Sequence, residues 1–138
     1  MKHHVRERGE EHLFYIDSAG IGGWHTGELA DARMRGHAAR RGYELTSRAR
    51  KFYPEADFPA FDMIIGMDDQ NIRDLQEMAT TGAEREKIYK MTDFCTRHPG
   101  YTTVPDPYYG GDAGFELVLD LLEDGVEGLF AYIEGLSQ

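Results

Sequence analysis

Short apolar runs alternate with helix-like segments along this chain, and that alternation restricts the fold more than any other feature. The runs lie at residues 13–16, 62–67 and 86–91, and a segment with helical character follows each of them. A strand that is apolar along its whole length is typical of parallel sheets covered by helices on both faces. The sequence therefore predicts an α/β fold, a three-layer α/β/α arrangement around a parallel sheet, with three strands expected in these residues.

The helical segments are marked by their ends and, in one case, by a long apolar stripe. Residues 28–41 carry acids early and arginines late, and Gly42 follows as a predicted stop. Asp68 is the predicted N-cap of a helix that Gly82 is expected to end, and Asp112 is the predicted cap of the last helix. That last helix has the clearest helical period, through Phe115, Val118, Leu119, Leu122, Val126, Leu129 and Ile133.

Composition limits the class of protein. The 138 residues, 41% of them hydrophobic, suffice for one packed domain, which we assign to residues 1–138. No apolar run approaches the ~20 residues of a membrane span, and the charged first residues do not form a signal peptide. A formal net charge of −10 argues against non-specific nucleic-acid binding. Cys95 is the only cysteine, which excludes an internal disulfide and fits a reducing cytoplasm.

The loops that follow the predicted strands carry residues suited to a ligand site, because parallel sheets bind ligands at the carboxyl ends of their strands. The first loop contains Trp24 among glycines, and the third contains Asp106-Pro107-Tyr108-Tyr109. An acid held extended by proline beside two aromatic rings suits a general acid next to a pocket for a flat substrate. On these four residues alone, a surface turn whose tyrosines cover a core edge is the more ordinary reading. Trp24 and the tyrosine pair are expected to converge on one rim.

Five stretches of the chain form a recognisable series. They are Asp17-Ser18-Ala19-Gly20, Gly23-Trp24-His25-x-Gly27, Ser47-Arg48-Ala49-Arg50, Phe61-Asp62 running into residues 67–75, and Asp106-Pro107-Tyr108-Tyr109 with the glycines and Phe115 behind it. In this order, over nearly the whole chain from about Leu13, they resemble the low-molecular-weight protein tyrosine phosphatases. The resemblance implies a four-stranded parallel sheet between helices and the hydrolysis of phosphotyrosine through a phosphocysteine intermediate.

The resemblance also implies roles for individual residues. Asp106 matches the aspartic acid that protonates the departing tyrosine oxygen and then acts as a base toward water. Trp24, Tyr108 and Tyr109 match the aromatic walls of the substrate cleft. The implied partner is a phosphotyrosine protein or another aryl phosphate, with neither nucleic acid nor membrane. No cofactor is expected, and the histidines show no metal-ligand spacing.

The chain departs from the family at the nucleophile. The family cysteine stands in a loop with the pattern Cys, five residues, Arg, then Ser or Thr, where backbone N–H groups and the arginine hold the phosphoryl oxygens and keep the thiol ionised. That pattern does not occur here, since Tyr101 stands six positions after Cys95. We interpret Cys95 as a buried or half-buried bystander. We expect the domain to be N-terminally truncated, with residues 1–9 as the last turns of the family's first helix.

Two expectations follow from this departure. Without a nucleophile and a phosphate-binding loop, the chain as given should be inactive, and the alternative function is a non-catalytic interaction module or pseudo-phosphatase of the same fold. The family's first strand is central in its sheet, so the strands at residues 13–16 and 62–67 are expected to have unpaired edges. Such edges favour poor stability or self-association.

Other readings are less well supported. An arsenate reductase of the same fold relays electrons through additional cysteines, and one cysteine is too few. A protein arginine phosphatase of the family typically does not keep the aromatic pair that stands here as Tyr108-Tyr109. The acid pair Asp68-Asp69 is interpreted as a helix start, and the pair Glu123-Asp124 as part of a solvated helix face.

Overall fold

The computed structural model describes residues 1–22, 27–29, 31–46, 48, 50–98, 100–105 and 111–136. The chain divides into two compact units, Met1–Phe52 (unit 1) and Tyr53–Gln138 (unit 2). The assignment of residues 1–138 to one domain stays a prediction.

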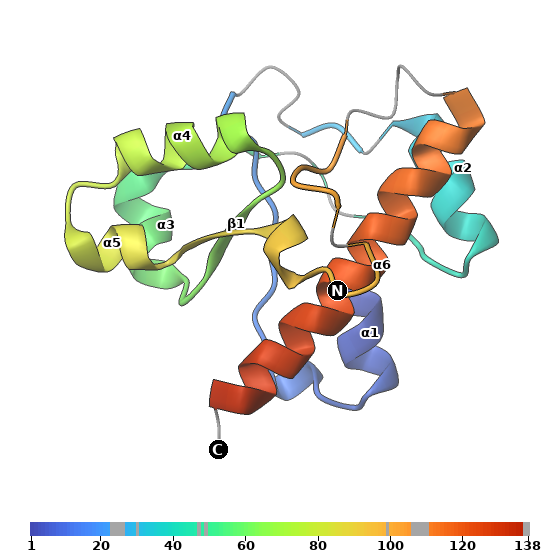
Figure 1. Ribbon diagram of the computed structural model, residues 1–138, viewed down its shortest axis with the longest axis horizontal. Coiled ribbons are helices and arrows are strands. Elements are labelled where there is room, and N and C mark those ends of the chain that lie inside the picture. Colours follow the sequence, from blue (N-terminus) through green and yellow to red (C-terminus); the bar gives the residue numbers. More distant parts are fainter. Residues whose placement is uncertain are drawn as a thin grey trace. The chain divides into compact units, whose positions relative to one another are not determined.

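Unit 2 contains the parallel sheet. Its elements in chain order are α3 (Pro54–Ala60), β1 (Ile64–Gly66), α4 (Asp69–Met78), α5 (Gly82–Glu86), β2 (Ile88–Lys90), the 3₁₀ turn η2 (Met91–Phe94) and α6 (Gly111–Leu136). The strands β1 and β2 run parallel, with Ile64 beside Ile88 and Gly66 beside Lys90. Figure 1 shows β1 with the helices α3, α4 and α5 around it, and α6 as one long helix. The predicted α/β class is confirmed, and both strands lie within predicted apolar runs.

The core of unit 2 is built on α6. The side chains of Phe115, Leu121 and Leu129 are at most 2% exposed. Burial of one such side chain contributes roughly 1.5–3 kcal/mol, so these residues supply much of the driving force for folding this unit. The predicted stripe is confirmed at its centre, although the buried face is wider and includes Leu121. Asp112 lies inside the first turn and is not a cap, because the helix already begins at Gly111.

Two glycines allow η2 to approach α6 closely. A Cβ atom on Gly125 would stand 2.8 Å from Met91 Sδ, and one on Gly128 would collide with the Phe94 carbonyl. Any other residue at Gly128 therefore requires the helix or the turn to move. This contact fixes the chain just after β2 against the last helix.

The ends of α4 correct one expectation. The helix begins behind Asp68 as predicted, but it ends at Met78, before Gly82. Gly82 is instead the first residue of α5, because the Thr81 side chain accepts a hydrogen bond from Glu84 N at 3.1 Å and caps that helix. The prediction that Gly82 ends a helix was wrong, since a threonine cap in front of it starts a new one.

Unit 1 is mostly helix and loop. Its elements are α1 (Lys2–Glu7), the 3₁₀ turn η1 (Glu11–Leu13) and α2 (Ala32–Arg40). Gly42 follows α2 with a φ of +86°, the left-handed conformation that a glycine stop provides. The helix begins later than predicted because Leu29 pairs with Arg48 in an antiparallel bridge and Asp31 caps the first turn.

The prediction of a strand at residues 13–16 is wrong. Leu13 ends η1, and the side chains of Leu13 and Tyr15 are 65% and 80% exposed. A strand needs a neighbour for its N–H and C=O groups. In the described part of unit 1 the β-pairings are the isolated bridges Gly20–Lys51 and Leu29–Arg48, and neither includes this run. The sheet therefore has two described strands where three were expected.

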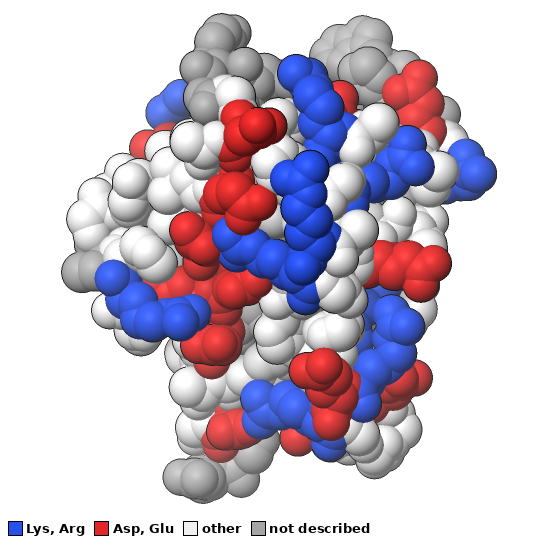
Figure 2. Space-filling view, turned by 90° about the vertical axis from the view of Figure 1, so that its right-hand side faces the viewer, with Lys and Arg blue, Asp and Glu red and all other residues white. Residues whose placement is uncertain are grey.

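Charge is divided unequally between the units. Unit 1 has ten Lys or Arg residues against seven Asp or Glu, whereas unit 2 has five against eighteen. The negative net charge of the chain thus comes from unit 2. In Figure 2, basic and acidic side chains are interspersed. Of the described helices, none is long and apolar enough to cross a membrane.

Candidate active site

The predicted site residues Trp24, Asp106, Tyr108 and Tyr109 all lie outside the described residues. Their roles and their convergence therefore stay predictions. The structure describes the segments on both sides of residues 106–110. The contacts of the preceding segment show how the chain before the predicted acid is held.

The carboxyl end of β1 holds the chain just before that acid. Val104 N donates a hydrogen bond to the carbonyl of Met67, the residue after β1, at 2.9 Å. Asp68 caps α4 by accepting a hydrogen bond from Asn71 N at 2.7 Å, as predicted. Asp106 follows Val104 by two residues in the sequence. Val104 is thus attached at the edge of the sheet where parallel sheets bind their ligands.

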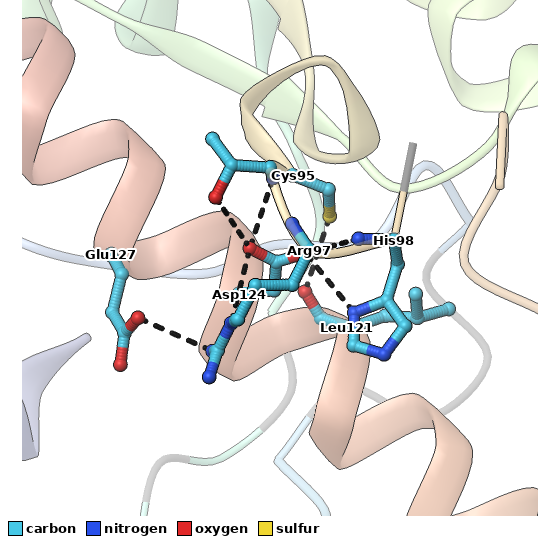
Figure 3. Close-up of polar contacts among 7 residues, drawn as sticks. Cys95, Arg97, His98, Leu121, Asp124 and Glu127 are labelled. Atoms are coloured by element: carbon cyan, nitrogen blue, oxygen red, sulfur yellow. Dashed lines mark hydrogen bonds and ion pairs between the residues drawn. The ribbon is translucent and has the colours of Figure 1, made fainter. Parts of the chain in front are cut away.

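A buried carboxylate holds the earlier part of the same segment. Asp124, on α6, is 0% exposed. It accepts hydrogen bonds from three consecutive backbone N–H groups, those of Thr96 at 3.0 Å, Arg97 at 2.9 Å and His98 at 2.9 Å. The Thr96 hydroxyl and His98 Nδ1 reach the same carboxylate at 3.3 and 3.1 Å. Figure 3 shows Arg97 and His98 on the loop facing Asp124 on the helix.

These contacts keep Asp124 ionised. Burial by itself raises the pKa of the carboxyl group, but the hydrogen bonds from Thr96, His98 and Arg97 outweigh it and hold the pKa well below its ordinary value. A carboxylate only accepts hydrogen bonds, so His98 Nδ1 is a donor in this contact. Arg97 adds an ion pair, with Nε 3.6 Å from Asp124 Oδ1. The charge of Asp124 is thus fully compensated inside the protein.

In unit 1, two of the five recognised stretches contact each other. Arg50 Nε lies 2.9 Å from Asp17 Oδ2, and Ser18 N donates to Asp17 Oδ1 at 2.8 Å. Gly20 N donates to the Arg50 carbonyl at 2.8 Å, which forms part of the bridge next to them. The first and third stretches are therefore adjacent in space.

Comparison with known proteins decides the family. The model of the low molecular weight phosphotyrosine protein phosphatase family matches residues 1–137. The chain belongs to this family. A low molecular weight protein-tyrosine-phosphatase of Streptomyces coelicolor is 38% identical over 130 residues, which cover 94% of this chain and 79% of that protein.

Solved structures of phosphatases agree with this assignment. A protein tyrosine phosphatase from Entamoeba histolytica superposes with a TM-score of 0.92 at 39% identity, covering 99% of this chain and 86% of the other. YfkJ from Bacillus subtilis superposes with a TM-score of 0.86 at 34% identity, covering 99% and 84%. The α/β fold of this phosphatase family is therefore also the fold of this chain.

Cys95 has the properties of a thiol that stays protonated. Its side chain is partly buried, and Sγ lies 3.5 Å from the Leu121 carbonyl oxygen as a donor. Burial and the nearby charge of Asp124 raise the pKa of the thiol. A phosphatase nucleophile needs the opposite, a depressed pKa in an electropositive loop. The environment of Cys95 therefore supports its interpretation as a bystander.

The interpretation of Glu123-Asp124 as a solvated face was wrong for Asp124. Glu123 is only half-buried, but Asp124 lies among the buried residues of α6, three positions after Leu121 and five before Leu129. An acid on the apolar side of a long helix was the available signal, because a buried acid needs several donors. The donors belong to a loop 26 to 28 residues earlier, which helical periodicity does not reveal.

Among the residues that the structure describes, no group of three His, Cys, Asp or Glu side chains could hold a metal ion. Asp124 and His98 are close, but their contact is a hydrogen bond that the backbone donors of the loop extend. Asp124 and His98 are therefore part of a structural contact between α6 and the loop at residues 96–98.

Proposed function

We propose that this chain carries the acid–base half of a phosphotyrosine phosphatase site, with Asp106 as the general acid. The observation that supports this most is the hydrogen bond from Val104 to Met67, because it attaches the chain two residues before Asp106 at the carboxyl end of β1. Membership of the phosphatase family supports the same role. Trp24, Tyr108 and Tyr109 are proposed to form the walls that hold the substrate ring.

In the proposed reaction, a cysteine thiolate forms the S–P bond while the P–O bond to tyrosine breaks. Asp106 donates its proton to the departing phenolate oxygen, then takes a proton from the water that hydrolyses the phosphocysteine. A positioned acid of this kind contributes roughly 10²–10⁴-fold. The cysteine must come from a Cys-x5-Arg loop, and residues 1–138 contain no such pattern. We therefore propose that these 138 residues by themselves do not turn over aryl phosphates.

The test compares two polypeptides with phenyl phosphate and a phosphotyrosine peptide. One is residues 1–138, and the other is the same chain preceded by a family first strand and Cys-x5-Arg-Ser loop joined in register. The proposal expects turnover only in the second, and a loss of roughly 10²-fold or more there on Asp106→Ala. Turnover by the first polypeptide, or undiminished turnover after Asp106→Ala, contradicts it. Asp112→Ala, an exposed acid at the start of α6, is the matched control.

The absent pattern also favours a second candidate, a non-catalytic module that binds phosphotyrosine without hydrolysing it. The two functions separate in a binding experiment on residues 1–138. Saturable binding of a phosphotyrosine peptide that is lost on Trp24→Ala supports the module. No binding by these residues, together with turnover by the extended chain, supports the enzyme.

Self-association is a further proposal for the chain as given. The apolar side chains of Leu13 and Tyr15 are exposed, and no described β-bridge includes their segment. Exposed apolar side chains of this kind favour association with another chain. Sedimentation velocity should show concentration-dependent species that Tyr15→Lys reduces, since a charged side chain opposes burial of this surface. A monodisperse monomer at every concentration contradicts the proposal.

We also propose the cytoplasm as the compartment. The single cysteine fits a reducing environment, where no disulfide is needed. Fractionation of the source cells with an antibody against the chain tests this. Recovery outside the cytoplasmic fraction contradicts it.

A further inference from the structure

The segment between η2 and Asp106 is held by side chains and single backbone contacts, outside helices and strands. It begins at Cys95, turns at residues 96–98 and runs to Pro105, and the predicted acid follows directly. A loop of this kind has no ladder of hydrogen bonds to fix its path. Its conformation therefore depends on the few groups that accept its N–H donors.

Asp124 is the most demanding of these groups. It accepts from Thr96, Arg97 and His98 in succession, and it is completely buried. Three successive N–H groups pointing at one carboxylate define the local backbone path as a fixed turn. A neutral side chain of the same shape offers fewer acceptor positions and brings no charge, so it cannot hold the turn equally well.

Further contacts carry this turn toward the acid. The His98 carbonyl accepts from Tyr101 N at 3.2 Å, and the His98 and Tyr101 rings meet edge to face with centroids 6.3 Å apart. Three residues later, Val104 N is bonded to Met67. The chain is thus held at residues 96–98, at 101 and at 104, and a proline with a restricted φ precedes Asp106.

We infer that Asp124 is a positioning residue for Asp106: it anchors on α6 the loop that leads to the proposed general acid. The inference rests on the proposed function, because it concerns the acid of that reaction. Asp124 is buried against Thr96 and His98 and does not itself act on the substrate. Its effect is on the path of the loop, and an error of about 1 Å in the position of a catalytic group can cost roughly 10²-fold in rate.

Leaving-group dependence distinguishes positioning of an acid from a general loss of structure. A phenolate that is a poor leaving group needs protonation by the acid, whereas dinitrophenolate leaves without it. The experiment uses the extended polypeptide described above, with phenyl phosphate and 2,4-dinitrophenyl phosphate as substrates. We expect Asp124→Asn to lower kcat/KM for phenyl phosphate about tenfold to a hundredfold, with little change for dinitrophenyl phosphate. The comparison uses kcat/KM because it reports the step in which the phenolate leaves, and not the later hydrolysis in which Asp106 acts as a base for both substrates.

Three variants make the outcome decisive. Asp106→Ala must show the same selective loss for phenyl phosphate. If it does not, the proposed role of Asp106 as the general acid is wrong, and the failure lies in the proposed function and not in the contacts of Asp124. Leu75→Ala removes a side chain that is 4% exposed on α4, far along the chain from the loop. This variant measures how a general loss of stability changes the rates with the two substrates. Glu127→Gln removes the other acid that Arg97 contacts, at 3.2 Å on the surface, and should leave both rates unchanged.

The inference is overturned if Asp106→Ala is selective but Asp124→Asn lowers both rates equally, as Leu75→Ala does. It is also overturned if Asp124→Asn leaves both rates unchanged. Thr96→Val and His98→Gln provide milder variants should Asp124→Asn fold poorly, because each removes one side-chain contact and keeps the carboxylate. Thr96→Val should then show a smaller loss with the same preference for phenyl phosphate, and His98→Gln a somewhat larger one, because it also removes the ring contact with Tyr101. Amide hydrogen exchange at Val104, in residues 1–138 without extension, should accelerate in Asp124→Asn and not in Glu127→Gln.

Discussion

The two units use apolar residues differently. In unit 1 the continuous run at residues 13–16 lies at the surface, with Tyr15 80% exposed. In unit 2 the runs at 62–67 and 86–91 pair with each other, and α6 buries its apolar side. Of the fourteen buried hydrophobic residues in the described part of the chain, eleven belong to unit 2. The two runs of unit 2 therefore form paired strands whose residues are mostly half-buried, whereas the run of unit 1 lies outside the described β-bridges.

The largest expected effect tests this difference with one residue type. Leu129→Ala in α6 should cost about 2–5 kcal/mol of unfolding free energy, because a side chain 1% exposed leaves a cavity. Leu13→Ala, at 65% exposure, should change it by less than about 0.5 kcal/mol. Urea denaturation followed by circular dichroism measures both. Equal costs at the two positions would show that residues 13–16 are buried in solution.

What could be predicted from the sequence follows the same division. The strands and last helix of unit 2 were predictable because their patterns are local and their partners lie nearby in the same unit. The structure of residues 13–16 was not predictable, because the apolar pattern of a segment does not show whether a neighbouring strand is there to pair with it. Asp124 was missed because its donors lie in a distant loop, although its place on a buried stripe was visible. The predicted site residues Trp24, Asp106, Tyr108 and Tyr109 rest on the motif series and stay predictions.

Two helix glycines sharpen the comparison. Gly128→Ala in α6 should destabilise by about 1–3 kcal/mol, because the new Cβ collides with the Phe94 carbonyl and η2 or the helix must move. Gly36→Ala in α2 meets no atom within 4 Å and should stabilise by about 1 kcal/mol, the ordinary helix preference for alanine. Thermal unfolding of both variants gives the sign directly. Stabilisation by Gly128→Ala would mean that η2 does not pack on α6.

Acid should affect the anchored loop of unit 2. The hydrogen bonds to Asp124 lower the pKa of its carboxyl group against the opposing effect of burial, so its contribution is complete above the unfolded pKa of about 4 and is lost as pH falls below it. Protonation should weaken charge-assisted hydrogen bonds worth roughly 1.5–3 kcal/mol each. Denaturation between about pH 6 and pH 3 should show a smaller fall in stability for Asp124→Asn than for wild type.

Asp31 is the control for this titration in unit 1. Burial opposes the effect, but the hydrogen bonds from the backbone and side chain of Arg33 lower the pKa of this helix cap as well. Asparagine caps helices about as well as aspartate does. Asp31→Asn should therefore preserve the cap, and because the Asp31 side chain is 31% exposed, it should flatten the pH dependence of unfolding less than Asp124→Asn does. An equal flattening by Asp31→Asn and Asp124→Asn would show that burial does not distinguish the two acids.

The smallest expected effects concern one ion pair in each unit. Asp17 and Arg50 are each 31% exposed and 2.9 Å apart, whereas Arg97 and Glu127 are more than half exposed and 3.2 Å apart. Double-mutant cycles should give a coupling of up to about 1 kcal/mol for the first pair and about 0.3 kcal/mol for the second, since exposure screens the charges. Added salt should reduce both couplings. The first pair joins two family stretches in unit 1, the unit with little core. A coupling near zero for Asp17 and Arg50 would mean that the bridge beside them, through Gly20 and Lys51, holds those stretches together without help from charge.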